Sequence, residues 1–278
     1  MNRSAVVADR VFTLSAWIFG GLGLALPFSI VGFILVNGAH VISWQFLTED
    51  PAGFPLGMAG GILPAIKGSL ALVGIGVVIA LPTAVGGAIY LTEYGKNVFV
   101  LRSVRFITEC LAANPAIIYG LCGYSLLVVF MALKISLLAG AITLGLMMFP
   151  IILIGSQEAI QAVESEYREA ALSLGVTKAY VVRWIILRKA LPGILAATVL
   201  ATGHALGSAA PILFTASTVF SHGGMSLDAP VMTLPTHLYY LVNQALSFDH
   251  AYGTALVLVV LLFMINFLAW TLKRYVGR

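Results

Sequence analysis

Six long apolar segments dominate the chain, and the polar residues gather between them. The segments are roughly Val11–Val36, Ile62–Leu91, Ile107–Leu133, Ser136–Gly155, Leu191–Phe214 and Tyr252–Leu272. Each is long enough to cross a hydrocarbon core of about 30 Å as a helix. Because only a helix or a closed barrel pairs its own backbone groups in lipid, the pattern predicts an all-α membrane protein with six transmembrane helices.

Several of these segments contain proline, namely Pro82, Pro115 and Pro150. In water, each would predict the end of a helix. In a membrane bundle, neighbouring helices satisfy the freed carbonyl groups. We therefore expect kinked helices that continue through the prolines.

The composition supports a membrane location. Hydrophobic residues make up 60% of the 278 positions and charged residues 9%, against about 25% charged residues in a typical soluble domain. The formal charge of +4 does not indicate nucleic-acid binding, because the basic residues lie in the loops between apolar segments. Cys110 and Cys122 share one segment, and on one continuous helix they would be about 18 Å apart, too far for a disulfide.

Lysine and arginine are concentrated in alternate connections. All of the 15 basic residues except Lys67 and Lys134 lie before the first segment, between the second and third, between the fourth and fifth, or after the sixth. Cytoplasmic loops carry such an excess of positive charge. The pattern therefore predicts that both termini are cytoplasmic, as an even number of spans requires.

Two connections on the opposite side are long. The first, residues 37–61, is rich in glycine and proline, and the second runs from Thr215 to Ala251. Within the second, Val231–Leu246 is mildly apolar. We predict a short interfacial or re-entrant helix there.

The charged connection between the fourth and fifth segments is predicted to be helical. Glu164, Glu166 and Glu169 suit the positive N-terminal end of a helix dipole, and Gly175 suits a C-terminal cap. We predict a short helix, a turn at Gly175, and a second amphipathic helix that leads into the fifth span.

The stretch Glu169-Ala-Ala-Leu-Ser-Leu-Gly175, with Leu191 and Pro192 downstream, resembles the EAA loop of ABC importer permeases. The resemblance implies that residues 164–192 hold a cytoplasmic coupling helix, which docks in a cleft of an ATPase subunit. The docking residues would be Glu169, Ala170, Ala171, Leu172 and Gly175. The alternative is a solvated amphipathic loop that lies on the membrane surface.

Four further stretches resemble phosphate-specific importer permeases of the PstA type. They begin at Gly60 (GGILPAI), Ala88 (AIYLTEYG), Pro115 (PAIIYGL) and Ala205 (ALGSAAPILFTA). The resemblance implies the type I ABC importer transmembrane fold for residues 61–275, after a first transmembrane helix and outer loop in residues 1–60.

The resemblance also implies a set of partners in the cytoplasmic membrane of a prokaryote. These are a second permease subunit in a heterodimer, two ATP-binding subunits and an extracytoplasmic substrate-binding protein, with lipid around the spans. The chain itself would need no cofactor, because ATP and Mg²⁺ would be held by the ATPase subunits.

The departures from the family pattern fall where the solute should pass. His204 and Ser208-Ala209 stand where the family has arginine and Glu-Thr, and Ile154–Glu158 lacks the arginine of the family's R-T-T-E. His204 and Ser208 would lie one turn apart on a helical face that continues to Pro211 and Thr215. With Asn114 in the third span, they are predicted to line the translocation path as weak neutral donors.

Each of these residues also has a structural interpretation. His204 would bond to a neighbouring helix, Ser208 would bond the carbonyl four residues earlier, and Asn114 would repair the backbone before Pro115. Gly203 and Gly207 form a small-xxx-small pair. The pair predicts close contact with another helix, for example one of the partner permease.

Several kinds of chemistry lack their motifs. The sequence contains no G-x-x-x-x-G-K-[ST] loop for ATP phosphates, no His/Cys cluster at metal-ligand spacing, and no Ser/His/Asp set in a supporting motif. The resemblance implies a permease subunit for inorganic phosphate, and the missing motifs argue against an enzyme. The alternatives are a permease for phosphonate, molybdate or sulfate, an autonomous secondary transporter or channel, and a membrane anchor or assembly factor without transport.

Overall fold

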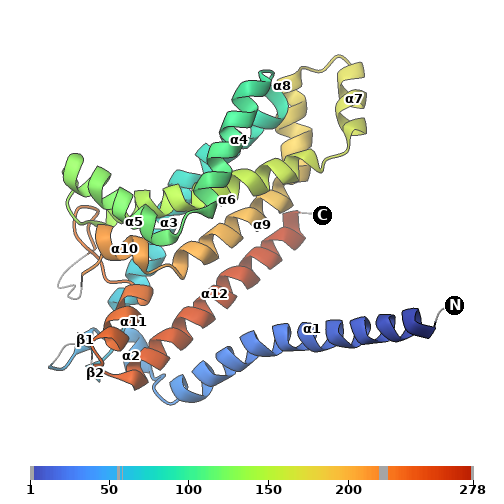
Figure 1. Ribbon diagram of the computed structural model, residues 1–278. Helices are drawn as coiled ribbons and strands as arrows, with labels where there is room; N and C mark the ends of the chain where they lie inside the picture. The colour runs from blue at the N-terminus through green and yellow to red at the C-terminus, as the bar shows by residue number, and fades with distance from the viewer. Residues whose placement is uncertain (1–2, 55–56, 58, 219–224, 277–278) are drawn as a thin grey trace.

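The computed structural model describes residues 3–54, 57, 59–218 and 225–276, so Arg278, which contributed to the charge pattern, lies outside the described residues. Helices form nearly all of the regular structure, and their order is shown in Figure 1. The elements are α1 (Arg3–Gly38), α2 (Trp44–Thr48), β1 (Pro51–Ala52), β2 (Ala59–Gly60), α3 (Leu63–Ile89), η1 (Tyr90–Tyr94), α4 (Val98–Ala113), α5 (Ala116–Gly123), η2 (Tyr124–Phe130), α6 (Leu137–Gln161), α7 (Ser165–Ser173), α8 (Lys178–Tyr180), η3 (Val181–Ile186), α9 (Leu187–Leu206), α10 (Ala210–Thr215), α11 (Leu234–Asn243) and α12 (Phe248–Val276). The η elements are π-helical continuations of their neighbours.

Among the described residues, five helical stretches are long and apolar enough to cross a membrane. They are Asp9–Gly38, Leu63–Tyr94, Leu137–Gln161, Lys178–Leu206 and Phe248–Thr271. The bent pair Val98–Ala113 and Ala116–Phe130 makes a sixth when it is counted as one span. The prediction of an all-α protein with six transmembrane helices is confirmed on this count.

The third span differs from the prediction. We expected one continuous helix over Ile107–Leu133, but α4 ends at Ala113 and α5 leaves it at an angle of 102°. Pro115 has no N–H and disfavours the helical conformation at the residue before it, and Asn114 is accordingly extended, with ψ at 134°. Cys110 and Cys122 therefore lie on different helices, and both are free thiols.

The fifth span ends earlier than predicted. A helix over Leu191–Phe214 was expected, but α9 ends at Leu206 and α10 begins at Ala210. Pro211 cannot donate a backbone hydrogen bond to the carbonyl of Gly207, so the chain turns there. His204 and Thr215 thus stand on separate helices rather than on one continuous face. By contrast, Pro82 and Pro150 lie inside α3 and α6, which continue through them as predicted.

Helix α6 is the centre of the bundle, with α3 and α9 packed against it. Small residues bring α6 and α9 close together along this contact. A Cβ atom added to Gly155 would lie 2.4 Å from the Cβ of Ala197, and one added to Gly193 would lie 2.5 Å from the Cβ of Ala159. Such spacing leaves no room for a larger side chain at either glycine.

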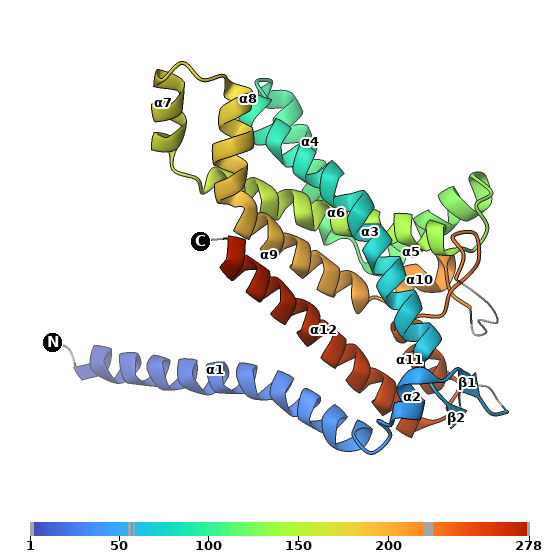
Figure 2. The same ribbon diagram turned by 180° about the vertical axis from the view of Figure 1, so that it is seen from behind.

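Helix α1 lies apart from this bundle along most of its length (Figures 1 and 2). None of the apolar window of Asp9–Gly38 is buried in the chain. Near its C-terminal end α1 contacts α12, where the rings of Phe33 and Tyr252 meet edge to face at 5.7 Å. Its exposed apolar side chains suit a lipid or protein surface rather than water.

The end of the molecule opposite α7 holds the two long connections. The predicted short helix within Val231–Leu246 is confirmed as α11, which Thr233 and Thr236 cap reciprocally. In the first connection, α2 is followed by the two-residue strands β1 and β2, which pair antiparallel. The sequence pattern did not predict this hairpin. We call this region the hairpin end.

Candidate functional site

The predicted docking loop has the expected local structure. Helix α7 covers Ser165–Ser173, and Gly175 follows with φ at +77°. The N–H of Gly175 donates a hydrogen bond of 3.0 Å to the carbonyl of Leu172. Glycine adopts this left-handed conformation without the steric cost that other residues pay, so a cap at Gly175 is confirmed. The second predicted helix is confirmed as the continuous stretch Lys178–Leu206.

The five predicted docking residues divide between two faces. Ala171 is buried in a cluster that includes Val181 and Val182. Glu169, Ala170, Leu172 and Gly175 are exposed. Beside them, the side chain of Leu174 is 84% exposed. The loop therefore presents an apolar knob next to a rigid turn, and its docking on an ATPase remains a prediction.

Charged groups attach α7 to the rest of the chain. Arg168 pairs with Glu93 of η1, with Nη2 and Oε1 3.0 Å apart. The Lys189 ammonium lies 3.9 Å from the centre of the Tyr167 ring, a cation–π contact between α9 and α7. Sequence analysis missed these contacts, because the partners stand far apart in the chain.

The structure places His204 and Ser208 together at the end of α9. The hydroxyl of Ser208 donates a hydrogen bond of 2.7 Å to the backbone carbonyl of His204. A serine hydroxyl has one proton to donate, so in this conformation Ser208 makes the local bond that we considered as its structural role. The side chain of His204 is exposed and makes no hydrogen bond within the described residues. The assignment of both to the pathway stays a prediction.

Asn114 lies elsewhere, at the bend between α4 and α5. It is exposed and lines an apolar cavity of about 520 Å³ bounded by α3, α5 and α6. Leu111 is the residue whose carbonyl loses its partner at Pro115, and the Tyr119 hydroxyl donates a hydrogen bond of 2.8 Å to that carbonyl. The backbone N–H of Asn114 donates a hydrogen bond of 3.1 Å to the same carbonyl, so Tyr119 and Asn114 share the repair that we considered for Asn114. The cavity lining does not include His204.

Gly203 and Gly207 are not closely packed within the chain. A Cβ atom added to Gly203 would meet Leu262 at 3.7 Å, which is an ordinary contact. One added to Gly207 would meet only its own helix. Gly207 is exposed and Gly203 is half-buried, and the contact of both with a partner helix stays a prediction.

A second cavity, of about 250 Å³, opens between α4 and α6 towards the α7 end. Its polar lining is Arg105, Thr108, Glu109, Gln157, Glu158 and Gln161. Arg105 and Glu109 form an exposed ion pair of 2.8 Å. The helical spacing of these polar residues in α4 and in α6 was a signal that sequence analysis overlooked.

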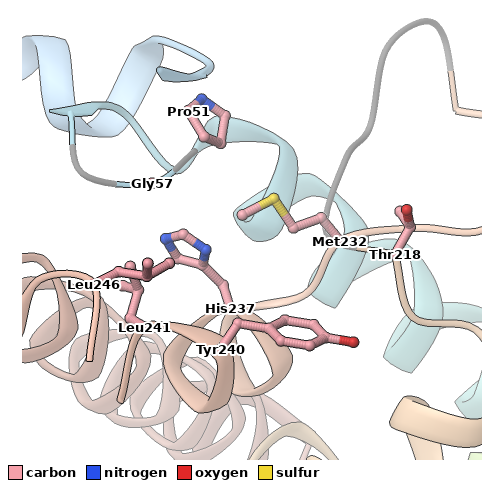
Figure 3. Close-up of a pocket in the computed structure, with 8 residues that line it drawn as sticks. All are labelled: Pro51, Gly57, Thr218, Met232, His237, Tyr240, Leu241 and Leu246. Atoms are coloured by element: carbon pink, nitrogen blue, oxygen red, sulfur yellow. The ribbon is translucent and has the colours of Figure 1, made fainter. Parts of the chain in front are cut away.

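At the hairpin end, a small cavity of about 10 Å³ lies beside His237, room for about one water. Figure 3 shows the His237 ring pointing from α11 toward the Gly57 loop, with Met232 and Leu241 beside it. His237 as a whole is 6% exposed. Burial, and secondarily His250, lowers the pKa of His237 to about 4, so the ring is neutral near pH 7.

Comparisons with known proteins agree with this architecture. Residues 10–278 match the model of the binding-protein-dependent transport system inner membrane component family. A probable ABC transporter permease protein YqgI of Bacillus subtilis is 28% identical, covering 97% of this chain and 95% of that protein. The phosphate transport system permease protein PstA 2 of Mycobacterium bovis is 35% identical, covering 87% and 81%.

A solved structure shares the fold. An inward-facing MetNI methionine ABC transporter chain superposes with a TM-score of 0.62 at 23% identity, covering 78% of this chain and 95% of that one. At that identity the likeness concerns the fold alone. The family match over residues 10–278 and the 35% identical relative establish more. The chain is a multi-pass membrane protein that belongs to the binding-protein-dependent transport system inner membrane component family, the permeases of ABC importers.

Proposed function

We propose that this chain is a permease subunit that translocates inorganic phosphate across the cytoplasmic membrane, driven by ATP hydrolysis on separate subunits. The observation that carries the proposal is the 35% identity, over 87% of the chain, to a phosphate transport permease. Phosphonate, molybdate and sulfate are the other solutes to test, because His204 and Ser208 stand where the phosphate family has a charged pair.

The proposed assembly follows from the family. A second permease forms a heterodimer with this chain, two ATP-binding subunits hold ATP and Mg²⁺, and an extracytoplasmic protein delivers the solute. Both termini lie in the cytoplasm, on the side where the basic loops gather. The chain itself binds no cofactor.

Docking on an ATPase subunit is assigned to α7 and the Gly175 turn. Three features support this assignment. Leu172 and Leu174 are 49% and 84% exposed, the turn is fixed by a positive φ, and Ala171 holds the other face to the bundle. An exposed apolar knob on a rigid support suits a protein cleft.

In the path, His204 offers an imidazole donor on an exposed surface. An arginine grips an oxyanion with two parallel hydrogen bonds, and an imidazole does not. A weak donor lets an anion pass without trapping it. Selectivity then rests with the binding protein and with the partner permease.

Uptake of radiolabelled phosphate at limiting phosphate tests the proposal. The host should lack its other phosphate importers and carry this gene, an empty vector, or the gene with Gly175→Val. We expect uptake only with the intact gene, and no competition from excess sulfate, molybdate or phosphonate. Equal uptake with the empty vector would exclude phosphate, and strong competition by one of the other anions would identify the solute instead.

A further inference from the structure

One carboxylate contacts both sides of the docking loop. The Glu93 side chain is 7% exposed, and its Oε1 lies 3.0 Å from Nη2 and 3.1 Å from Nε of Arg168. Its Oε2 lies 4.0 Å from Nζ of Lys178, and the same ammonium hydrogen-bonds the backbone carbonyl of Glu93. Arg168 precedes the Gly175 turn and Lys178 follows it, so Glu93 holds the loop on both flanks.

Arg168 extends this junction to a third element. Its Nη1 donates a hydrogen bond of 2.6 Å to the carbonyl of Val163, and its Nη2 donates one of 2.9 Å to the carbonyl of Ile160. These carbonyls lie at the end of α6 and just after it. One guanidinium thus joins α3–η1, α6 and α7, and its planar fork makes these bonds together.

The Glu93–Arg168 pair is less exposed than the Arg105–Glu109 pair of α4. Arg105 and Glu109 have side chains that are 80% and 55% exposed and stand one turn apart on α4. An exposed pair of that kind contributes little to stability. In the Glu93–Arg168 pair the carboxylate is 7% exposed and the guanidinium side chain 24%, so removing one partner leaves the other charge largely out of water without its partner.

The opposite end of the helix formed by α3 and η1 also packs against the rest of the chain. The stretch Leu63–Tyr94 is 32 residues long, about 48 Å as a helix. Near its start, the hydroxyl of Ser69 accepts a hydrogen bond of 2.8 Å from the backbone N–H of Leu234, the first residue of α11. A Cβ atom on Gly68 would lie 2.1 Å from the carbonyl oxygen of Met232. Figure 2 shows α3 running between these two ends of the molecule.

We propose that Glu93 is the positioning residue through which movement of the docking helix α7 is passed to α3, and through α3 to α11 at the hairpin end. This inference rests on the proposed docking of α7 on an ATPase subunit. Because Arg168 and Lys178 share one carboxylate, a displacement of the loop moves the end of α3 with it. The buried contacts at Ser69 and Gly68 then carry that displacement to the start of α11.

A cysteine at the far end of α3 tests this link without reference to the solute. The complex with the partner permease and ATPase subunits is reconstituted with Cys110→Ser, Cys122→Ser and Lys67→Cys, since Lys67 is exposed near the start of α3. The rate of labelling by a membrane-impermeant maleimide is measured with and without ATP. The test variant is Glu93→Gln, and the matched control is Glu109→Gln.

We expect ATP to change the labelling rate in the parent and in Glu109→Gln. In Glu93→Gln this change should shrink at least about fivefold, with the yield of complex and the basal ATPase rate retained. Arg168→Lys should give an intermediate loss, because an ammonium is a point charge that lacks the guanidinium's forked donors. It also serves as the second variant if Glu93→Gln does not assemble.

Three results would overturn the proposal. The first is a full ATP-dependent change of the labelling rate in Glu93→Gln, and the second is no such change in the parent. The third is a smaller change in Glu93→Gln and Arg168→Lys that is fully explained by a lower yield of assembled complex. The last would make Glu93 a folding residue. Failure of the phosphate assignment is separate, because it would appear as absent uptake alongside normal ATP-dependent labelling.

Discussion

Replacing Gly175 with valine should uncouple ATP hydrolysis from transport while leaving the protein in the membrane. Gly175 has φ at +77°, and apart from its two chain neighbours no described residue lies within 4 Å of a Cβ atom added there. The space is therefore open, and the whole effect within this chain comes from the backbone. A residue other than glycine pays about 1–2 kcal/mol in this conformation, and a β-branched residue is the least suited to it.

The backbone cost of valine at position 175 determines how often the native turn is populated. A penalty of about 2 kcal/mol lowers the ratio of the native turn to other turn conformations by a factor of about 30. Without the turn, Leu174 no longer stands in a fixed place beside Leu172. Asparagine visits the left-handed region more readily than other residues with a side chain, so Gly175→Asn is the matched control.

The assay is uptake and ATP hydrolysis by the complex in proteoliposomes, with the yield of copurified ATPase subunit. We expect Gly175→Val to lower uptake by about tenfold or more, while the copurified ATPase still hydrolyses ATP and the permease inserts normally. Gly175→Asn should stay within about threefold of the wild type. Equal defects in the two variants, or wild-type uptake with valine, would refute the backbone explanation.

Three other residues give separate predictions. His204→Ala should lower the transport rate by about two- to tenfold, the worth of one hydrogen bond; a fall in complex yield with an unchanged rate per complex would make His204 structural. Tyr119→Phe removes the bond to Leu111, so the purified protein should lose about 1 kcal/mol of stability, and an unchanged melting temperature would contradict this role. The folded pKa of His237, about 4, lies below its ordinary value of 6.5, so the unfolded chain binds the proton first. Stability should then fall by up to about 3 kcal/mol between pH 6.5 and pH 4, and melting curves of His237→Gln should lack this part of the pH dependence.

The sequence analysis was most accurate for features that depend only on the thickness of the bilayer or on one residue. The second apolar segment was placed at Ile62–Leu91, and the helix covers Leu63–Tyr94. The cap at Gly175 was also foreseen, because a helix end selects glycine for local steric reasons. Both predictions needed only neighbouring positions in the chain and the polarity of the surroundings.

Proline shows where this kind of reasoning ends. Pro82 and Pro115 both deprive a carbonyl of its partner, yet α3 continues and the third span bends by 102°. Near Pro82, the Thr83 hydroxyl bonds carbonyls of the same helix. Near Pro115, the hydroxyl of Tyr119 reaches back across the bend to Leu111. That second bond exists only once α5 has turned away, so local sequence patterns do not predict it.

The placement of charge bears on how an oxyanion would cross. Among the described residues the contacts between acidic and basic side chains are His40–Asp249, Arg105–Glu109 within α4, and the junction of Glu93 with Arg168 and Lys178. None of them includes His204 at the end of α9. A charge buried without a partner is costly in a membrane. If phosphate is the solute and His204 and Ser208 line its path as proposed, this chain would offer an imidazole and a hydroxyl there, and the cationic contacts would come from the partner permease. The two permeases of the heterodimer would then contribute different groups to the path, an imidazole and a hydroxyl from this chain and cations from its partner. His204→Arg should therefore slow release of the anion rather than speed its passage.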